Sequence, residues 1–220
     1  LYNNTTASNN TAVGYQAGYS TTTGTPIAVL GYLAATSNTT GGDIVAMGSQ
    51  ALRFNTTGSY NIAIGSLALY SNTTGTQSTA VGYQAGYSNT TGGGFTAVGA
   101  NAGYTYNSTA ESAGSVFVGV NSGQNTTGHD NTLIGGYAGW KLGSGTNNTA
   151  VGAGALQSTG TVANNTGQFN SAFGVGALSG NSSGNNNTAI GYQSLVNNTT
   201  ASNNTAVGYQ AGYSNTTGTG

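Results

Sequence analysis

Charge is almost missing from this chain, because only 2% of its 220 residues are Asp, Glu, Lys or Arg and the net charge is −1. Ordinary soluble domains carry about 25% charged residues. The two basic residues are too few to neutralise a run of phosphates or to hold the chain on an anionic bilayer. No apolar run approaches about 18 residues. We therefore expect no nucleic-acid partner and no direct membrane insertion.

Cysteine is absent and proline occurs once. The first absence removes disulfides and thiolate metal sites. The second, together with glycines that do not fall at every third position, excludes a collagen triple helix. Disordered chains usually combine high net charge with few aromatic residues, whereas this chain has 14 tyrosines. An ordered, repetitive architecture is what these exclusions leave.

A repeat of about 17 residues runs through the sequence. Each unit is marked by a glycine that follows a short apolar run, and this glycine is predicted to bend the chain, where a side chain would clash or forbid positive φ. A fixed period of about 20 residues with β-branched residues is typical of a β-solenoid or β-roll. We predict an all-β parallel solenoid of about twelve coils, one repetitive segment over residues 1–220. The turn glycines are Gly14, Gly31, Gly48, Gly65, Gly82, Gly99, Gly119, Gly135, Gly152, Gly174, Gly191 and Gly208.

Immediately before each turn glycine stands a large apolar residue, and before that stands alanine in nine units. The alternation predicts a short strand with two unlike faces. We predict that the large residues point into the coil and form its core, and that the alanine-rich face is available for burial against another chain. The predicted core residues are Val13, Leu30, Met47, Ile64, Val81, Val98, Val118, Ile134, Val151, Phe173, Ile190 and Val207.

The rest of each unit is rich in residues that favour turns, such as "SNTTG" at 71–75. We predict turns there because Asn and Gly tolerate left-handed conformations. Asn-x-Ser/Thr sequons recur in this half, which we expect to face solvent. They are either N-glycan acceptors or simply good turns. The candidate acceptors are Asn38, Asn55, Asn72, Asn89, Asn125 and Asn215. Aromatic residues at one position of the unit are expected to stack as partial ladders: Tyr19, Tyr70, Tyr87, Tyr104, Trp140 and Tyr213.

Two units are longer than the rest and carry their extra residues at 104–115 and 157–170. Insertions in a solenoid protrude as loops, so these segments are the favoured places for a partner. Catalysis is not expected. His129 and Asp130 are adjacent, and a relay needs a His and an Asp that converge on one nucleophile, so we interpret them as an exposed turn pair. Asp43, Glu111 and Asp130 fall in separate units. We predict no catalytic, cofactor or metal site.

The segments "NTAVG", "NIAIG", "NSAFG" and "NTAIG" resemble the repeat "NSVAIGxxA" of YadA-like heads in trimeric autotransporter adhesins, and similar Gly/Asn-rich repeats of bacteriophage tail fibres. The resemblance covers the apolar pentad of all twelve units. It implies a left-handed β-roll, three chains about one axis, and attachment to host or matrix surfaces. The 17-residue period and the Asn/Thr-rich turn half depart from that family.

These patterns predict a structural extracellular fibre segment, an adhesin or tail-fibre-like rod at a cell surface or on a virion. Its expected partners are copies of itself, as a homotrimer or an end-to-end filament, and a host, matrix or cell-surface ligand. Both ends of the sequence fall within a coil and lack caps, which predicts an excerpt of a longer fibre or a unit that stacks. A self-assembling amyloid-like filament and an ice-binding solenoid are the alternatives.

Overall fold

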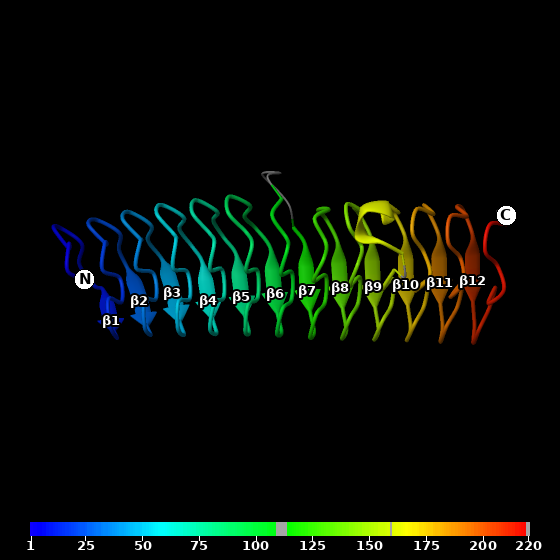
Figure 1. Ribbon diagram of the computed structural model, residues 1–220, viewed down its shortest axis with the longest axis horizontal. Helices are drawn as coiled ribbons and strands as arrows, with labels where there is room; N and C mark the ends of the chain where they lie inside the picture. The colour runs from blue at the N-terminus through cyan, green and yellow to red at the C-terminus, as the bar shows by residue number, and fades with distance from the viewer. Residues whose placement is uncertain (109–113, 159, 219–220) are drawn as a thin grey trace. The chain divides into compact units, whose positions relative to one another are not determined.

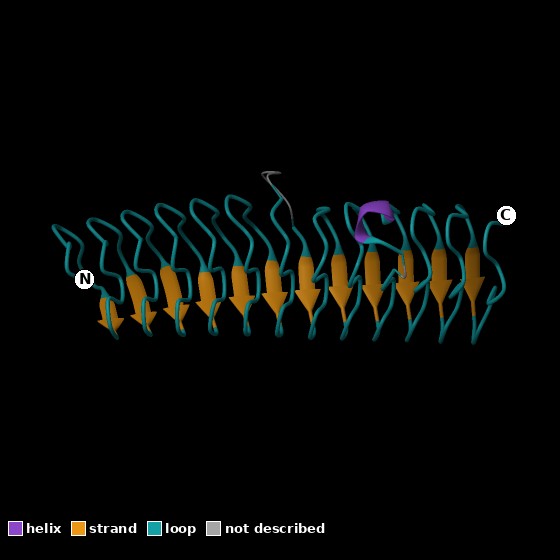
Figure 2. Cartoon of the chain, in the orientation of Figure 1, coloured by secondary structure: helices purple, strands orange, loops and turns teal. Residues whose placement is uncertain are grey.

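The computed structural model describes residues 1–108, 114–158 and 160–218 and separates into two compact units, residues 1–113 and 114–220. In each unit the chain winds into successive coils, and every coil contributes one short strand to a row of parallel strands (Figures 1 and 2). The described residues contain twelve strands and no α-helix. The predicted all-β parallel solenoid, with coils about 17 residues apart, is confirmed.

The strands are three or four residues long. Those of the first unit are β1 (Thr11–Val13), β2 (Ile27–Leu30), β3 (Ile44–Met47), β4 (Ile62–Ile64), β5 (Thr79–Val81) and β6 (Thr96–Val98). Those of the second are β7 (Val116–Val118), β8 (Thr132–Ile134), β9 (Thr149–Val151), β10 (Ser171–Phe173), β11 (Thr188–Ile190) and β12 (Thr205–Val207). A 3-10 turn, η1 (Val162–Asn164), lies in the longer connection before β10.

Neighbouring strands within a unit pair in parallel so that equivalent residues of consecutive repeats face each other. Ala46 lies opposite Ala63 in the first unit, and Ala172 lies opposite Ala189 in the second. This register places the same repeat position in one column from coil to coil. The properties of each column therefore follow from the residues that the repeats place at that position.

The predicted core column lies on the outside, so that prediction is wrong. Nine of its twelve residues are 36–66% exposed, and Val81, Val118 and Val151 are half-buried. The residue at the centre of the strand points inward instead and is fully buried in most coils, as at Ala63 and Ala172. Successive side chains of a strand point to opposite faces. The narrow coil accepts alanine inside and leaves the larger neighbours in solvent, so the alanine face is not free to pack against another chain.

The interior is completed by residues that follow the turn glycine. The alanine or serine three positions after it is buried in all coils except the last, and the next position holds a buried leucine in five coils, as at Leu69 and Leu178. In some of the coils where that position is glycine, a large side chain from another column fills the space. A Cβ at Gly86 would lie 2.9 Å from the Phe95 ring, and one at Gly139 would lie 2.5 Å from Leu133. In these coils the space that glycine leaves in one column is thus filled by a large side chain from another column, which keeps the interior closely packed.

All twelve turn glycines have φ between 127° and 144°. Residues with a Cβ avoid this region, which only glycine enters readily. Space imposes the same requirement: a Cβ at Gly135 would lie 2.6 Å from the carbonyl oxygen of Gly152 in the next coil. At the turn glycines, consecutive backbones therefore lie too close together to admit a side chain.

Two columns of buried asparagine run along the interior. In the first unit, the Nδ2 groups of Asn55, Asn72 and Asn89 each donate to the Oδ1 of the asparagine one coil before, at 2.8–2.9 Å. In the second unit the same pattern joins five residues at 3.1–3.2 Å: Asn131, Asn148, Asn170, Asn187 and Asn204. Buried polar groups are usually hydrogen-bonded, and these amides bond to one another from coil to coil and fix the coil register, although the buried Oδ1 of Asn89, at the end of its column, has no partner among the described residues.

Replacing Asn72 with aspartate tests this ladder. Asn72 donates to Asn55 Oδ1 at 2.8 Å and to the Gly75 carbonyl at 3.1 Å. A carboxylate of the same shape would face both acceptors without a proton, at about 1–3 kcal/mol for each lost partner. Thermal unfolding at pH 7 should show a loss of about 3 kcal/mol.

The loss should shrink as pH falls. Burial raises the folded-state pKa of the new carboxyl above its unfolded value of about 3.9, so protonation favours the folded state at low pH, and stability falls as pH rises through the folded pKa. The exposed variant Asn9→Asp is the matched control and should melt like the parent chain. Equal melting of the two variants at pH 7 would contradict the ladder's role.

The two insertions do more than protrude, so the expectation of simple surface loops is wrong. In 104–115, Tyr106 is fully buried against the Phe95 ring, with centroids 5.1 Å apart, and residues 109–113 lie outside the described part of the chain. In 157–170, Asn165 is buried and its Nδ2 donates to the Lys141 carbonyl at 2.6 Å, while Thr161 and Val162 are exposed. Each insertion therefore fills part of the interior as well as extending the surface.

Candidate functional site

The outer face of the strands in the first unit is an exposed apolar surface. Its central column is the large apolar residue before each turn glycine, and Leu30, Met47 and Ile64 are 45%, 39% and 37% exposed. The outward residue two positions earlier is also apolar in β2–β4, where Ile62 is 38% exposed. Folded single chains seldom expose large contiguous apolar patches unless these bind something. This surface is called the outer strand face below.

The second unit carries the same face with a different flanking column. Ile134, Phe173 and Ile190 are 38%, 40% and 42% exposed. The outward residue at the start of each strand from β8 to β12 is a hydroxyl-bearing one: Thr132, Thr149, Ser171, Thr188 and Thr205. The face is therefore a regular array of aliphatic and hydroxyl groups without charge.

Tyrosine side chains form stacked columns in both units. Tyr70, Tyr87 and Tyr104 stack at centroid distances of 5.0 Å with rings within 4° of parallel, which agrees with the expected partial ladder. Burial raises the pKa of the Tyr87 phenol, and the neighbouring Tyr104, Tyr70 and Tyr83 phenols raise it further.

A second set of tyrosines, immediately after the turn glycine, borders the outer strand face. Tyr15 stacks on Tyr32 in the first unit, and Tyr192 stacks on Tyr209 in the second. All four are 45–74% exposed. They widen the apolar surface and add hydroxyl groups at its edge.

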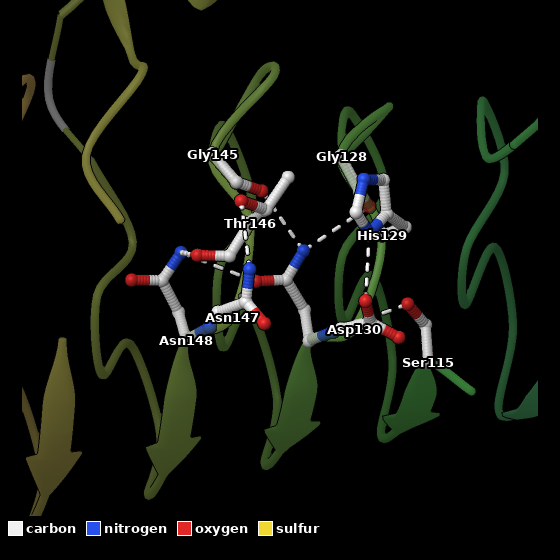
Figure 3. Close-up of polar contacts among 9 residues, drawn as sticks. Ser115, Gly128, His129, Asp130, Gly145, Thr146, Asn147 and Asn148 are labelled. Carbon is white, nitrogen blue, oxygen red and sulfur yellow. Dashed lines mark hydrogen bonds and ion pairs between the residues drawn. The ribbon is translucent and has the colours of Figure 1, made fainter. Parts of the chain in front are cut away.

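His129 and Asp130 lie in the turn before β8, where Figure 3 shows imidazole and carboxylate facing each other. His129 Nδ1 lies 2.7 Å from Asp130 Oδ2, and both side chains are 42% exposed. The nearby Ser115 hydroxyl accepts a hydrogen bond from the Asn131 backbone amide at 3.2 Å. The pair is thus an exposed turn pair, as interpreted from the sequence. An exposed pair of this kind contributes little to stability.

The few other charged groups are dispersed. Arg53 donates to Gln50 Oε1 at 2.7 Å and lies over the Phe54 ring, 5.1 Å from its centroid, while Lys141 lies 4.7 Å from the centroid of the Trp140 ring. Within the described ranges, no three His, Asp or Glu side chains converge as metal ligands would. Nor is any helix of the described chain long and apolar enough to cross a bilayer.

The sequon asparagines do not face solvent, so that expectation is wrong for most of them. Asn38, Asn55, Asn72 and Asn89 are fully buried, and Asn125 and Asn215 are half-buried. A glycan would be attached through Nδ2, and in Asn72 this atom donates to Asn55 and to Gly75 inside the coil. In the folded chain these side-chain amides form hydrogen bonds inside the coil and stabilise its core.

A hollow of about 420 Å³ opens beside the end of the 157–170 insertion. It is lined by Thr166, Gln168, Phe169, Asn185 and Asn186, all from the second unit. A second hollow of about 390 Å³ lies in the first unit beside the outer strand face, where Asp43, Pro26 and Ile44 are among its lining residues.

Comparison with protein-family models, with curated proteins and with solved structures found no match to this chain. Sequence reasoning missed the outer strand face, although a signal was present. The small residue that stands next to the large one in most units marks the crowded side of the strand, and that side is the interior.

Proposed function

We propose that this chain is a structural segment of an extracellular fibre that assembles from several copies through the outer strand face. The observation that carries the proposal is the column of exposed aliphatic side chains, such as Leu30 and Ile134, that recurs from coil to coil. Exposed apolar surface of this extent favours association, since burial is worth about 25 cal/mol per Å².

A second copy is the occupant that the surface chemistry favours. The outward strand positions carry no charge in either unit, so they offer nothing to a charged partner, whereas a like face would match them. Taking the half-exposed aliphatic and tyrosine side chains of one unit together, the apolar surface available is on the order of 600 Å². A standard interface buries about 800 Å² per partner, so one unit supplies most of such an interface.

The stack of coils in each unit suits a mechanical role. Its hydrogen-bonded columns repeat from coil to coil, and a solenoid of this kind is extended by adding repeats rather than by redesigning a core. The resemblance to adhesin heads and tail fibres adds surface attachment to the proposal, with a cell surface or virion as its location and a homotrimer as the assembly.

The test is the native mass of the full chain by analytical ultracentrifugation, followed by cryo-electron microscopy without imposed symmetry. We expect three copies that meet through the outer strand face. A monomer at micromolar concentration would contradict the proposal. A single column of coils continuing from chain to chain would favour the filament alternative instead.

An ice-binding array is the second candidate, and one observation favours it. The column of Thr132, Thr149, Thr188 and Thr205 on the second unit's strands is regular and outward-facing. Ice binding needs this face open to solvent, whereas assembly covers it. A monomeric chain that produces thermal hysteresis would support this candidate, and an assembled chain without hysteresis would reject it.

A further inference from the structure

The hollow beside the 157–170 insertion has the chemistry of a ligand site. One aromatic ring, three side-chain amides and one hydroxyl line its volume of about 420 Å³: Phe169, Gln168, Asn185, Asn186 and Thr166. Ligand sites combine an apolar platform with a few placed polar groups in volumes of about 300–1,000 Å³. We propose that this hollow binds a neutral carbohydrate, which rests on the surface-attachment role proposed above and names the class of its ligand.

Phe169 is the platform, at a coil position where asparagine is the commonest residue and Tyr60 is the other aromatic one. It is 56% exposed with φ of 57°. The coils on either side place Asn147 and Asn186 at the same position, with φ of 58° and 57°. Asparagine tolerates the left-handed region far better than a bulky aromatic does. The exposed ring of Phe169 lines the hollow, where a ligand can reach it.

The backbone around the ring is fixed by the coils before and after it. The Phe169 amide donates to the Thr146 carbonyl at 3.2 Å, and the Thr166 amide donates to the Ser182 carbonyl at 2.8 Å. The next residue, Asn170, is anchored in the buried asparagine ladder. A ligand therefore meets a largely preformed surface and loses little affinity to ordering.

Hydrogen bonds also position the side-chain amides of the hollow. The backbone amide of Gln168 donates to Asn185 Oδ1 at 2.8 Å. The Nδ2 group of Asn185 is then the donor that this side chain can offer to a ligand. The Asn186 amide donates to the Gln168 carbonyl at 3.0 Å, which sets the position of the Asn186 side chain one coil further on. Hydroxyl groups of a sugar suit amide partners because they donate and accept hydrogen bonds at once.

The absence of charge selects among carbohydrates. Among the described residues, no charged side chain lines the hollow, so a carboxylate or sulfate on the ligand would lose water without gaining a cationic partner. The apolar face of a pyranose ring can lie on Phe169 while its hydroxyls reach the surrounding amides. A neutral hexose or N-acetylhexosamine unit fits this arrangement.

The experiment applies the full chain to immobilised oligosaccharides, comparing neutral hexose- and N-acetylhexosamine-based glycans with sialylated and sulfated ones. The variant Phe169→Asn installs the residue that adjacent coils carry at this position, so the coil should fold unchanged. The matched control is Tyr60→Asn, because Tyr60 occupies the same coil position in the first unit, is 60% exposed and has φ of 61°. Circular dichroism melts confirm that both variants are folded.

We expect binding to neutral glycans that weakens at least tenfold in Phe169→Asn and is unchanged in Tyr60→Asn. Three results would overturn the proposal: no glycan binding by the parent chain, binding that survives Phe169→Asn, or binding to acidic glycans alone. Sedimentation of the same samples separates this test from the proposed assembly. A chain that assembles but binds no neutral glycan rejects the carbohydrate site only, whereas a monomer that binds one rejects the assembly only.

Discussion

The double variant Leu30→Asp/Ile64→Asp should weaken self-association of the chain at least 100-fold. Both side chains are exposed on the outer strand face, at 45% and 37%. Fully burying an aliphatic side chain is worth about 1.5–3 kcal/mol, and because these two are already more than half buried, their remaining burial at an interface is worth roughly 1 kcal/mol each. A carboxylate in each place adds an unpaired charge whose desolvation costs at least about 1–3 kcal/mol. Since about 1.4 kcal/mol corresponds to a factor of ten, the two effects together exceed two orders of magnitude. Sedimentation velocity over a concentration series measures it.

The control places the same two charges at exposed turn positions of the same unit. Thr40→Asp/Thr74→Asp keeps the spacing of two coils between the carboxylates, and both threonines are exposed. We expect this chain to sediment like the parent. Melting temperatures should be similar for both double variants, because neither touches the interior. Equal sedimentation of the two would show that the outer strand face is not the interface.

The second large effect is expected from Gly135→Ala, which should destabilise the chain by about 3–5 kcal/mol. The φ of Gly135 is 131°, and a new Cβ would lie 2.6 Å from the Gly152 carbonyl oxygen and 2.7 Å from its carbon. Strained backbone costs about 1–3 kcal/mol, and overpacking against rigid neighbours adds about 1–3 kcal/mol. For a chain of this size, the melting temperature should fall by about 10 °C.

The adjacent glycine is an internal control. A Cβ on Gly136 has one neighbour within 4 Å, the Val120 carbonyl oxygen at 4.0 Å. Alanine already stands at this position of the unit as Ala100 and Ala153. Gly136→Ala should therefore melt within about 2 °C of the parent chain. If both substitutions lowered the melting temperature equally, the turn glycines would not be required by the positive φ and close backbone contact described here.

Much of the fold was predictable because its information is local and repeated. The spacing of Gly14, Gly31 and Gly48 defines the coil length, and the apolar pentad defines the strand. Repetition carries this local pattern through every coil, so an all-β parallel solenoid follows from the period together with the short β-branched strand pattern. The stacked tyrosines followed in the same way, because a residue that recurs at one position of a coil must lie above its equivalent.

The direction of the side chains was not predictable in the same way. Alternation shows that Ala63 and Ile64 point to opposite faces, and hydrophobicity favours the larger one for the interior. The structure reverses this, since the narrow coil buries Ala63 completely and leaves Ile64 37% exposed. The sequon asparagines were predicted to face solvent because asparagine is common in turns. The sequons instead contribute the buried ladder of Asn55, Asn72 and Asn89.

The sequence alone thus determined the period, the parallel strands and the glycine at each bend, because these depend on contacts between identical positions one repeat apart. Only the tertiary structure decided which face lies inside and which stays exposed, because that depends on the width of the closed coil. It also decided the hollow at Phe169, which joins that ring to amides of the following coil. The outer apolar face and the polar hollow, on which the two proposals rest, belong to this second class.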